Sequence, residues 1–337
     1  MVIAMSVAIG IDGGGTKTLG ILADSAGRVL ACAEQGATNH QICGAQAAGR
    51  RLAALTETLL QTAGTQAREV GHLCLCLSGA DRPQDVRLLE ASLPGWLRAI
   101  PHSIQNDVWA AFAAGTACGW GAVSISGTGH NAAVRTRGGR MLGINALKFP
   151  LGNAGGGRML TDSALHMAFR AWEHTGPATA LAAELPAACG KASLSDVLEN
   201  VYKSDYTAQY AWPVPRLVDR LACQGDEVCR SLLCRLGDVQ GEMLAGLMAH
   251  AGLTQAHTPV VLAGSIYQKT VYTGLYDAFA ARIRAVCPGA QLTVAQGPPC
   301  AGAVLMALRQ LSPGAGQKAR RGWMDTLART LAGKEVA

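Results

Sequence analysis

Residues 9–22 read IGIDGGGTKTLGIL, and this stretch decides the fold. An apolar, β-branched run leads into Asp12 and three glycines, and a second apolar run follows shortly after them. The pattern predicts two strands joined by a glycine-rich turn. Glycines let the backbone approach an anion closely, so their N–H groups can bind phosphate oxygens. Asp12 can then hold Mg²⁺ directly or through water. The alternative is an ordinary tight hairpin whose glycines only make the turn.

A similar pattern returns about 115 residues later, where residues 123–134 read VSISGTGHNAAV. A β-type run, a short turn of glycine and threonine, and a second β-type run again follow one another. Two phosphate-type hairpins, one opening each half of the chain, predict two related domains that face a shared cleft. One hairpin can serve each side of a bound triphosphate.

A carboxylate stands between an expected strand and an expected helix. Residues 104–107 read IQND, and the helical pattern VWAAFAAG follows. A helix N-terminus stabilises negative charge, so Asp107 can stay ionised and act as a base. The alternative is that Asp107 is only the N-cap of that helix.

Two further segments offer groups to a ligand. Residues 260–266, VVLAGSI, predict a strand followed by Gly264 and Ser265, a shape against which a flat base can lie. Residues 36–39, GATN, place Asn39 after an expected strand, where its amide can bind a polar ligand. The alternatives are an ordinary strand-to-helix turn for the first segment and a plain turn residue for Asn39.

Composition and charge exclude several classes of protein. The chain has 337 residues, 49% of them hydrophobic, which predicts two domains with sizeable cores. Half of the formal net charge of +6 lies in residues 318–337, so no clustered basic face for nucleic acid is expected. No apolar run reaches the roughly 18–20 residues that span a bilayer. The apolar first residues are typical of a strand rather than a signal peptide.

The cysteines point to a reducing compartment. There are 11 of them, with no C-x-x-C pair, and most have apolar neighbours. This pattern indicates buried, reduced thiols in a cytosolic protein. A metal or iron–sulfur site is the alternative, and the spacing gives it little support.

Strand-like runs alternate with helical patterns, which predicts an α/β protein. The expected strands are residues 7–11, 19–24, 29–33, 72–77, 103–105, 122–126, 132–135, 260–263 and 291–294. The expected helices are residues 46–62, 108–115, 161–172, 193–202, 215–222, 226–251, 275–286 and 301–311.

The same patterns predict the domain organisation. We expect a first domain of residues 1–116 with a C-terminal helix at about 300–312, and a second domain of residues 117–299. The second carries a helical insertion at about 160–255. A basic tail, residues 313–337, has apolar residues at helical spacing and is expected to be a docked or frayed helix. A helix that binds a membrane surface or a partner is the alternative.

Taken in order, the motifs IDGGGTKT, GATNH, LSGAD, QNDVWAA, SGTGHN and VVLAGS resemble the actin/hsp70/sugar-kinase superfamily. Within it, they look most like the N-acetylglucosamine-kinase branch of the BadF/BadG/BcrA/BcrD ATPase family. The resemblance covers roughly residues 7–311. It implies a two-domain actin-like ATPase fold with ribonuclease H-like domains and an ATP cleft between them. It also implies ATP and Mg²⁺ as cofactors, a small-molecule sugar as substrate, and a cytoplasmic homodimer.

The resemblance further implies roles for individual residues. Asp12 would lie near Mg²⁺, Asn39 and Asp107 would contact the sugar, and Asp107 would be the base that takes a proton from the attacking hydroxyl. The residues implied to bind ATP are Gly13, Gly14, Gly15, Thr16 and Lys17 in the first hairpin, Gly127, Thr128 and Gly129 in the second, and Gly264 and Ser265 beside the adenosine.

One segment departs from the family pattern. After the second phosphate loop the kinase branch usually carries Gly-Asp-Glu-Gly, whereas residues 151–155 here read LGNAG. Asn153 can still hydrogen-bond a sugar hydroxyl, but it is not a charged acceptor. Lys148 adds a cation, and His130 stands where the family usually has serine. We therefore expect a changed acceptor pocket, with Asn153 as a contact, for an acidic or otherwise modified sugar.

The sequence therefore predicts an ATP-dependent kinase that phosphorylates a hydroxyl of a sugar or amino sugar resembling N-acetylglucosamine or glucosamine. Two alternatives stay open. One is a non-catalytic regulator that responds to a sugar or nucleotide, which the missing Asp-Glu pair favours. The other is an ATPase that energises electron transfer, like the activators of 2-hydroxyacyl-CoA dehydratases, which the lack of a cysteine cluster motif disfavours.

Overall fold

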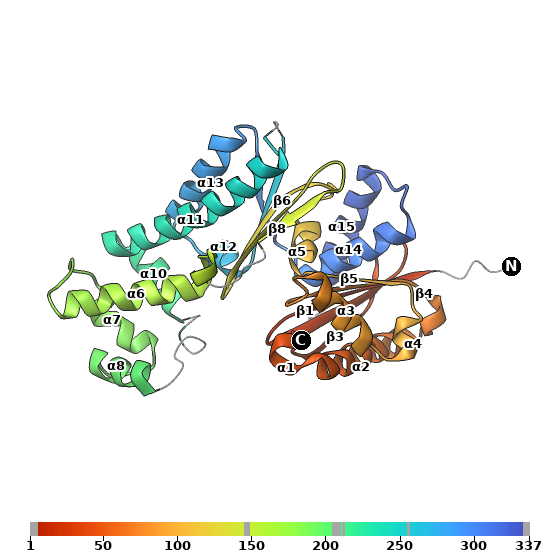
Figure 1. The fold of residues 1–337 in the computed structure, drawn as a ribbon, viewed down its shortest axis with the longest axis horizontal. Coiled ribbons are helices and arrows are strands. Elements are labelled where there is room, and N and C mark those ends of the chain that lie inside the picture. Colours follow the sequence, from red (N-terminus) through yellow and green to blue (C-terminus); the bar gives the residue numbers. More distant parts are fainter. Residues whose placement is uncertain (1–5, 145–148, 204–209, 211–212, 255–256, 333–337) are drawn as a thin grey trace. The chain divides into compact units, whose positions relative to one another are not determined.

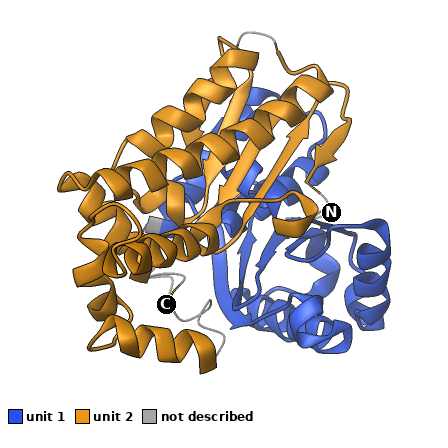
Figure 2. Ribbon diagram, turned by 60° about the vertical axis from the view of Figure 1, so that its left-hand side comes forward, with its two compact units in different colours: residues 1–119, 295–337 blue, residues 120–294 orange. Residues whose placement is uncertain are grey.

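The computed structural model describes residues 6–332 apart from 145–148, 204–209, 211–212 and 255–256. The chain divides into two compact units, coloured separately in Figure 2. Unit 1 comprises residues 1–119 and 295–337, and unit 2 comprises residues 120–294. Each unit contains one five-stranded sheet with helices packed on it (Figure 1).

In unit 1 the strand order is β3-β2-β1-β4-β5. The first three strands form an antiparallel meander, and β4 and β5 run parallel to β1. The strands are β1 (Val7–Gly13), β2 (Lys17–Ala23), β3 (Val29–Gly36), β4 (Val70–Leu77) and β5 (His102–Gln105). The helices are α1 (His40–Cys43), α2 (Ala45–Ala63), α3 (Pro83–Ser92), α4 (Gly95–Arg98), α5 (Val108–Gly115), α14 (Pro299–Leu311), α15 (Gln317–Ala332) and the 3-10 helix η1 (Ala67–Glu69).

Alternation along β1 sends its residues to two different cores. Ile9 and Ile11 pack with the apolar face of α2, whereas Ala8 packs with α14. Because side chains alternate along a strand, Gly10 and Asp12 share the α14 face with Ala8. Small residues there let the helix come close to the strand, and they leave room for a carboxylate at the strand end.

Two glycines set how closely α14 packs. A Cβ at Gly10 would collide with the backbone nitrogen of Val304 in α14. A Cβ at Gly302 would collide with the carbonyl oxygen of Ala110 in α5. Helix α14 therefore packs closely on both β1 and α5, which brings the start of α5 near the end of β1.

Unit 2 repeats the arrangement, with strand order β10-β9-β6-β7-β8. Strands β6, β7 and β8 form an antiparallel meander, and β9 runs parallel to both β6 and β10. The strands are β6 (Gly121–Ser126), β7 (His130–Arg135), β8 (Met141–Gly143), β9 (Pro259–Ala263) and β10 (Gln291–Val294). The helices are α6 (Gly156–Trp172), α7 (Leu181–Ala188), α8 (Leu194–Lys203), α10 (Pro213–Cys223), α11 (Glu227–Ala251), α12 (Ser265–Lys269), α13 (Gly274–Val286) and the 3-10 helix η2 (Phe149–Leu151).

The expected basic tail contains helix α15, which packs within unit 1. Leu327 is buried, and Trp323, Met324 and Leu331 pack against the same core as α14. Of the two forms expected for this tail, docked or frayed, residues 317–332 therefore have the docked one, while residues 333–337 lie outside the described part. Among the helices of the described residues, none has the length and apolar character needed to cross a membrane.

Candidate active site

The tip of the first hairpin is tight and exposed. Gly14 N donates to Lys17 O at 3.0 Å, which closes the turn. Gly15, Thr16 and Lys17 are exposed, and Lys17 Nζ lies 3.4 Å from Glu34 Oε2. The turn thus falls on the glycines, as predicted, and its tip is accessible to a ligand.

The Gly-Ala-Thr-Asn loop is held against this hairpin. The carbonyl oxygen of Gly14 accepts from Thr38 N at 3.1 Å and from Asn39 N at 3.2 Å. Asn39 also caps α1, because its Oδ1 accepts from Gln41 N at 2.9 Å. Its Nδ2 donates to Ser78 Oγ at 3.3 Å. Asn39 is therefore a helix cap fixed beside the hairpin, with one N–H of its side-chain amide directed at the loop after β4.

The carboxyl ends of three neighbouring parallel strands carry polar side chains. Asp12 lies at the end of β1, Asp81 follows β4, and Asn106 and Asp107 follow β5. Ligands of α/β sheets bind at this edge. The sequence pattern indicates Asp12 and Asp107 but not Asp81 and Asn106. The signal that could have indicated Asp81 as a site residue is its place in LSGAD, residues 77–81, at the end of the expected strand 72–77.

The side chain of Asn106 hydrogen-bonds the backbone at the start of α5. Its Oδ1 accepts from Val108 N at 3.0 Å, and its Nδ2 donates to Asp81 Oδ1 at 2.7 Å. Asp107 occupies the N-cap position without a regular side-chain capping bond, but a hydrogen bond from the backbone of Val108 lowers the pKa of its carboxyl group. Asn106 and Asp107 therefore both contribute side-chain oxygens to the N–H groups at the start of α5.

Burial and repulsion raise the pKa of both carboxyl groups. Burial and then the charge of Asp107 raise the pKa of Asp12 to about 7, against the opposing effect of Lys17. Burial and then the charge of Asp81 raise the pKa of Asp107 to about 6. Asp12 and Asp107 therefore lie close enough to repel each other, and a cation near them would relieve that repulsion.

The donor set of unit 1 fits Mg²⁺. Carboxylate oxygens are the hard ligands that this ion prefers, and it is usually held by one or two carboxylates together with phosphates and water. Within the described residues, no group of three or more His, Cys, Asp or Glu side chains could hold a metal by itself. Asp12 supplies such a carboxylate at the end of β1, and Asp107 supplies a second one near it.

The second hairpin, in unit 2, is attached to the start of α6. Gly157 N donates to Gly127 O at 2.7 Å, and Arg158 N donates to Thr128 O at 2.9 Å. Within the turn, Gly127 N donates to Gly129 O at 3.0 Å. The first turn of a 17-residue helix thus fixes the shape of the glycine loop.

The Ala-Gly-Ser turn lies directly beside this second hairpin. Gly264 has φ +93°, and a Cβ there would lie 2.5 Å from the carbonyl oxygen of Ser126, the last residue before the loop. Only glycine fits both the backbone conformation and the space. Ser265 then begins α12. The two predicted nucleotide motifs of unit 2 are therefore adjacent.

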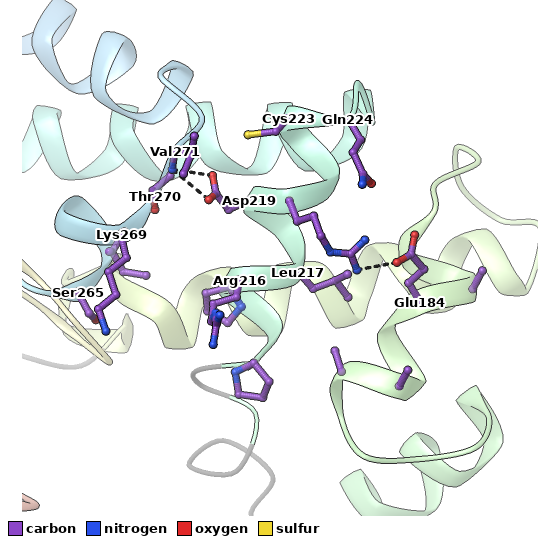
Figure 3. A pocket seen from close by; sticks show the side chains of 17 residues that line it. Glu184, Arg216, Leu217, Asp219, Cys223, Gln224, Ser265, Lys269, Thr270 and Val271 are labelled. Carbon is purple, nitrogen blue, oxygen red and sulfur yellow. Dashed lines mark hydrogen bonds and ion pairs between the residues drawn. The ribbon is translucent and has the colours of Figure 1, made fainter.

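A cavity of about 1140 Å³ opens beside Ser265 (Figure 3). It is lined by α7, α10 and α12, and Arg216, Ser265 and Lys269 are among the side chains on its wall. Elsewhere on its wall, Arg220 pairs with Glu184 at 2.6 Å. Arg216 forms no ion pair within the described part of the chain. The sequence pattern does not reveal this cavity, because its three helices are distant in the sequence.

Asn153 and His130 belong to a buried polar network. Asn153 Nδ2 donates to His130 O at 2.9 Å. His130 Nε2 lies 3.0 Å from Ser124 Oγ, which lies 2.9 Å from Tyr267 Oη. Burial lowers the pKa of His130 to about 4, so the ring is neutral at pH 7. Lys148, the cation expected near the acceptor, lies outside the described residues.

Comparison with known proteins identifies relatives of the whole chain. The model of the BadF/BadG/BcrA/BcrD ATPase family matches residues 9–307. The N-acetyl-D-glucosamine kinase of Dictyostelium discoideum is 26% identical over 322 residues, covering 89% of this chain and 97% of that protein. The N-acetylmuramic acid/N-acetylglucosamine kinase of Clostridium acetobutylicum is 26% identical over 308 residues, covering 90% and 98%.

A solved structure has the same fold. A candidate N-acetylglucosamine kinase from Chromobacterium violaceum superposes with a TM-score of 0.68 and 24% identity, covering 90% of this chain and 99% of that one. At this identity the match shows the fold alone. It confirms the predicted two-domain actin-like α/β fold, and the family match confirms the resemblance seen in the motifs.

Proposed function

This chain belongs to the BadF/BadG/BcrA/BcrD ATPase family, and we propose that it is an ATP-dependent kinase acting on an amino sugar of the N-acetylglucosamine class. Both curated relatives are sugar kinases that align over nearly their whole length. The observation that carries the proposal is the carboxylate of Asp107, which lies at the same edge of the sheet as Asp12, has a pKa of about 6 and raises the pKa of Asp12 by its charge.

In the proposed reaction, Asp107 accepts the proton of the acceptor hydroxyl as the hydroxyl oxygen bonds to the γ-phosphorus of ATP. The bond from that phosphorus to the β–γ bridging oxygen breaks, and ADP leaves with the electron pair. A base whose pKa lies near the working pH is both deprotonated and basic enough to help, and such a base contributes about 10²–10⁴ in rate. Asn39 is proposed to orient the sugar through its remaining amide N–H.

Mg²⁺ is proposed as the cofactor, with Asp12 as its protein ligand. When bound, the ion neutralises charge on the phosphates, which is most of what phosphoryl transfer requires of its catalyst. The raised pKa of Asp12 supports this role, because a buried carboxyl that repels its neighbour gains from a cation.

We propose that the hairpin of each unit binds phosphate groups of the nucleotide. The proposed residues are Gly13, Gly14, Gly15, Thr16 and Lys17 in unit 1 and Gly127, Thr128 and Gly129 in unit 2. Gly264 and Ser265 would contact the adenosine, which the cavity beside Ser265 is large enough to hold.

We also propose a class of acceptor sugar, an oligomeric state and a cellular location. The acceptor pocket would involve Asn153 and take a modified sugar. The relative named for N-acetylmuramic acid, an acidic amino sugar, makes that class a natural choice. The family resemblance favours a cytoplasmic homodimer.

The test is a coupled ADP-release assay with Mg-ATP and a panel of glucose, glucosamine, N-acetylglucosamine and N-acetylmuramic acid. We expect ADP release that depends on an amino sugar, with the phosphorylated sugar detected by mass spectrometry. ADP release that no sugar increases would contradict a kinase function. A clear best rate on plain N-acetylglucosamine would contradict the changed acceptor pocket while leaving the kinase function intact.

A further inference from the structure

Gln240 is a polar side chain in the core of unit 2. It lies on α11 and is fully buried, and its Nε2 donates to Ser126 Oγ at 2.7 Å. Its Oε1 is also buried and has no hydrogen-bond partner among the described residues. A buried polar atom without a partner costs free energy that an apolar side chain would not cost. Stability alone therefore does not explain a glutamine at this position.

The bond from Gln240 reaches the residue that leads into the second glycine loop. Ser126 is the last residue of β6, and Gly127 follows it. The carbonyl oxygen of Ser126 also lies against Gly264, where a Cβ would approach it to 2.5 Å. Ser126 is thus held at its side chain by Gln240 and at its backbone by the Ala-Gly-Ser turn.

Gln240 also packs against the segment that leads into α6. A Cβ at Gly155 would lie 3.0 Å from both Cγ and Nε2 of Gln240. Gly155 has φ +131°, which other residues rarely adopt, and α6 begins with the next residue. The first turn of α6 donates backbone N–H groups to the carbonyl oxygens of Gly127 and Thr128. One side chain of α11 therefore contacts both segments that determine the shape of the loop.

We propose that Gln240 is a positioning residue that fixes the loop of residues 127–129 for the phosphates of ATP. This inference rests on the proposed phosphate-binding role of the loop. Thr128 and Gly129 at its tip are exposed, so contacts on the buried side of the loop determine its shape. Without the bond to Gln240, the loop can adopt other conformations, and ordering it on a phosphate then costs binding free energy.

The test measures the affinities for ATP and for adenosine separately by isothermal titration. Gln240→Met keeps the length of the side chain and removes its hydrogen bond. We expect the affinity for ATP to fall about 3- to 10-fold, as for loss of one hydrogen bond, while the affinity for adenosine stays the same. Ser126→Ala removes the other partner and should give a similar loss. The two losses should not add in the double variant, because both substitutions break the same bond.

The double variant separates positioning from stability. Because Gln240→Met with Ser126→Ala replaces both partners with apolar groups, its thermal midpoint should stay close to that of the wild type. Met248→Ala is the matched control, since Met248 is a fully buried residue further along α11. It should lower the midpoint without changing the ratio of the affinities for ATP and adenosine. A ratio that follows the midpoint across these variants would overturn the positioning role.

Hydrogen exchange supplies a readout that needs no nucleotide. The backbone amides of residues 127–129 should exchange faster in Gln240→Met than in the wild type or in Met248→Ala. Equal exchange in the wild type and Gln240→Met, or an unchanged affinity for ATP, would overturn the proposal. If the wild-type protein binds ATP no more tightly than adenosine, the proposed phosphate-binding role fails, and the exchange rates still decide whether Gln240 fixes the loop.

Discussion

The charge of Asp107 raises the pKa of Asp12, although the two residues are 95 positions apart in the sequence. They are brought together because β1 and β5 both run parallel to β4 and end at the same edge of the sheet. The charge of the proposed base, Asp107, thus acts on the proposed metal ligand, Asp12. The chemical hypothesis for unit 1 depends on this pair.

Replacing Asp107 with asparagine tests its role as the base. Asp107→Asn keeps the shape of the side chain and removes its ability to take a proton. We expect turnover to fall at least about 100-fold while ATP binding stays nearly intact. Steady-state kinetics with a titration of ATP binding would check both. Unchanged turnover would show that Asp107 is not the base.

Adding a methyl group at two helical glycines should have opposite effects on stability. In Gly302→Ala the new Cβ collides with the backbone of Ala110, and such overpacking typically costs about 1–3 kcal/mol. In Gly246→Ala, on α11, the new Cβ meets nothing within 4 Å, and alanine favours a helix over glycine by about 1 kcal/mol. Thermal unfolding should therefore move down for the first variant and up for the second. A rise for Gly302→Ala would contradict the close packing of α14 on α5.

His130 should make stability depend on pH. Its pKa is about 4 in the folded protein, against an ordinary value of 6.5, because the ring is buried. Below pH 6.5 the unfolded chain binds a proton that the folded protein cannot bind. Stability is therefore lost as the pH falls from about 6.5 towards 4, by about 2 kcal/mol between pH 7 and pH 5.

The matched variant for this effect is His130→Gln, which offers hydrogen-bonding groups but does not titrate. Urea unfolding of both proteins at pH 7, 6 and 5 should show a steeper loss for the wild type. The raised pKa values of Asp12 and Asp107 act in the opposite direction, but they are common to both proteins and cancel in the comparison. Equal slopes would mean that His130 takes up its proton in the folded state.

Much of the fold follows from local sequence, because the decisive signals are short and repeated. The nine expected strands are all present, and the two glycine hairpins open the two sheets. Strand β8, with three residues, and helix α12, with five, are too short for periodicity to predict. Helix α3 begins at Pro83 in a polar segment, which favours a turn when only the sequence is known.

The sequence indicates candidate site residues only where they stand within a recognisable motif. Asp12 and Asp107 each stand in a recognisable context, so the sequence indicates them. The bond from Asn106 to Asp81 joins residues 25 positions apart, and no local pattern predicts it. Nor can a sequence decide how two adjacent residues, Asn106 and Asp107, share the N–H groups at the start of α5. Contacts with residues distant in the sequence, such as the bond from Asn106 to Asp81, determine this arrangement.

The cavity of unit 2 should contribute to the affinity for the nucleotide. Arg216 lines this cavity, as Ser265 does, and forms no ion pair within the described residues, so its charge is available to a ligand (Figure 3). An arginine can stack on a purine or bond a ribose or phosphate oxygen. We expect Arg216→Ala to raise the KM for ATP about 10-fold with little change in kcat, because an interaction made equally in the ground and transition states is lost. Isothermal titration with ADP would separate binding from turnover.

Arg284→Ala is the control for this prediction, since Arg284 is an exposed arginine on α13 that does not line the cavity. An unchanged ADP affinity for Arg216→Ala would show that the nucleotide lies elsewhere, whereas equal losses for the two variants would indicate a general effect of positive charge.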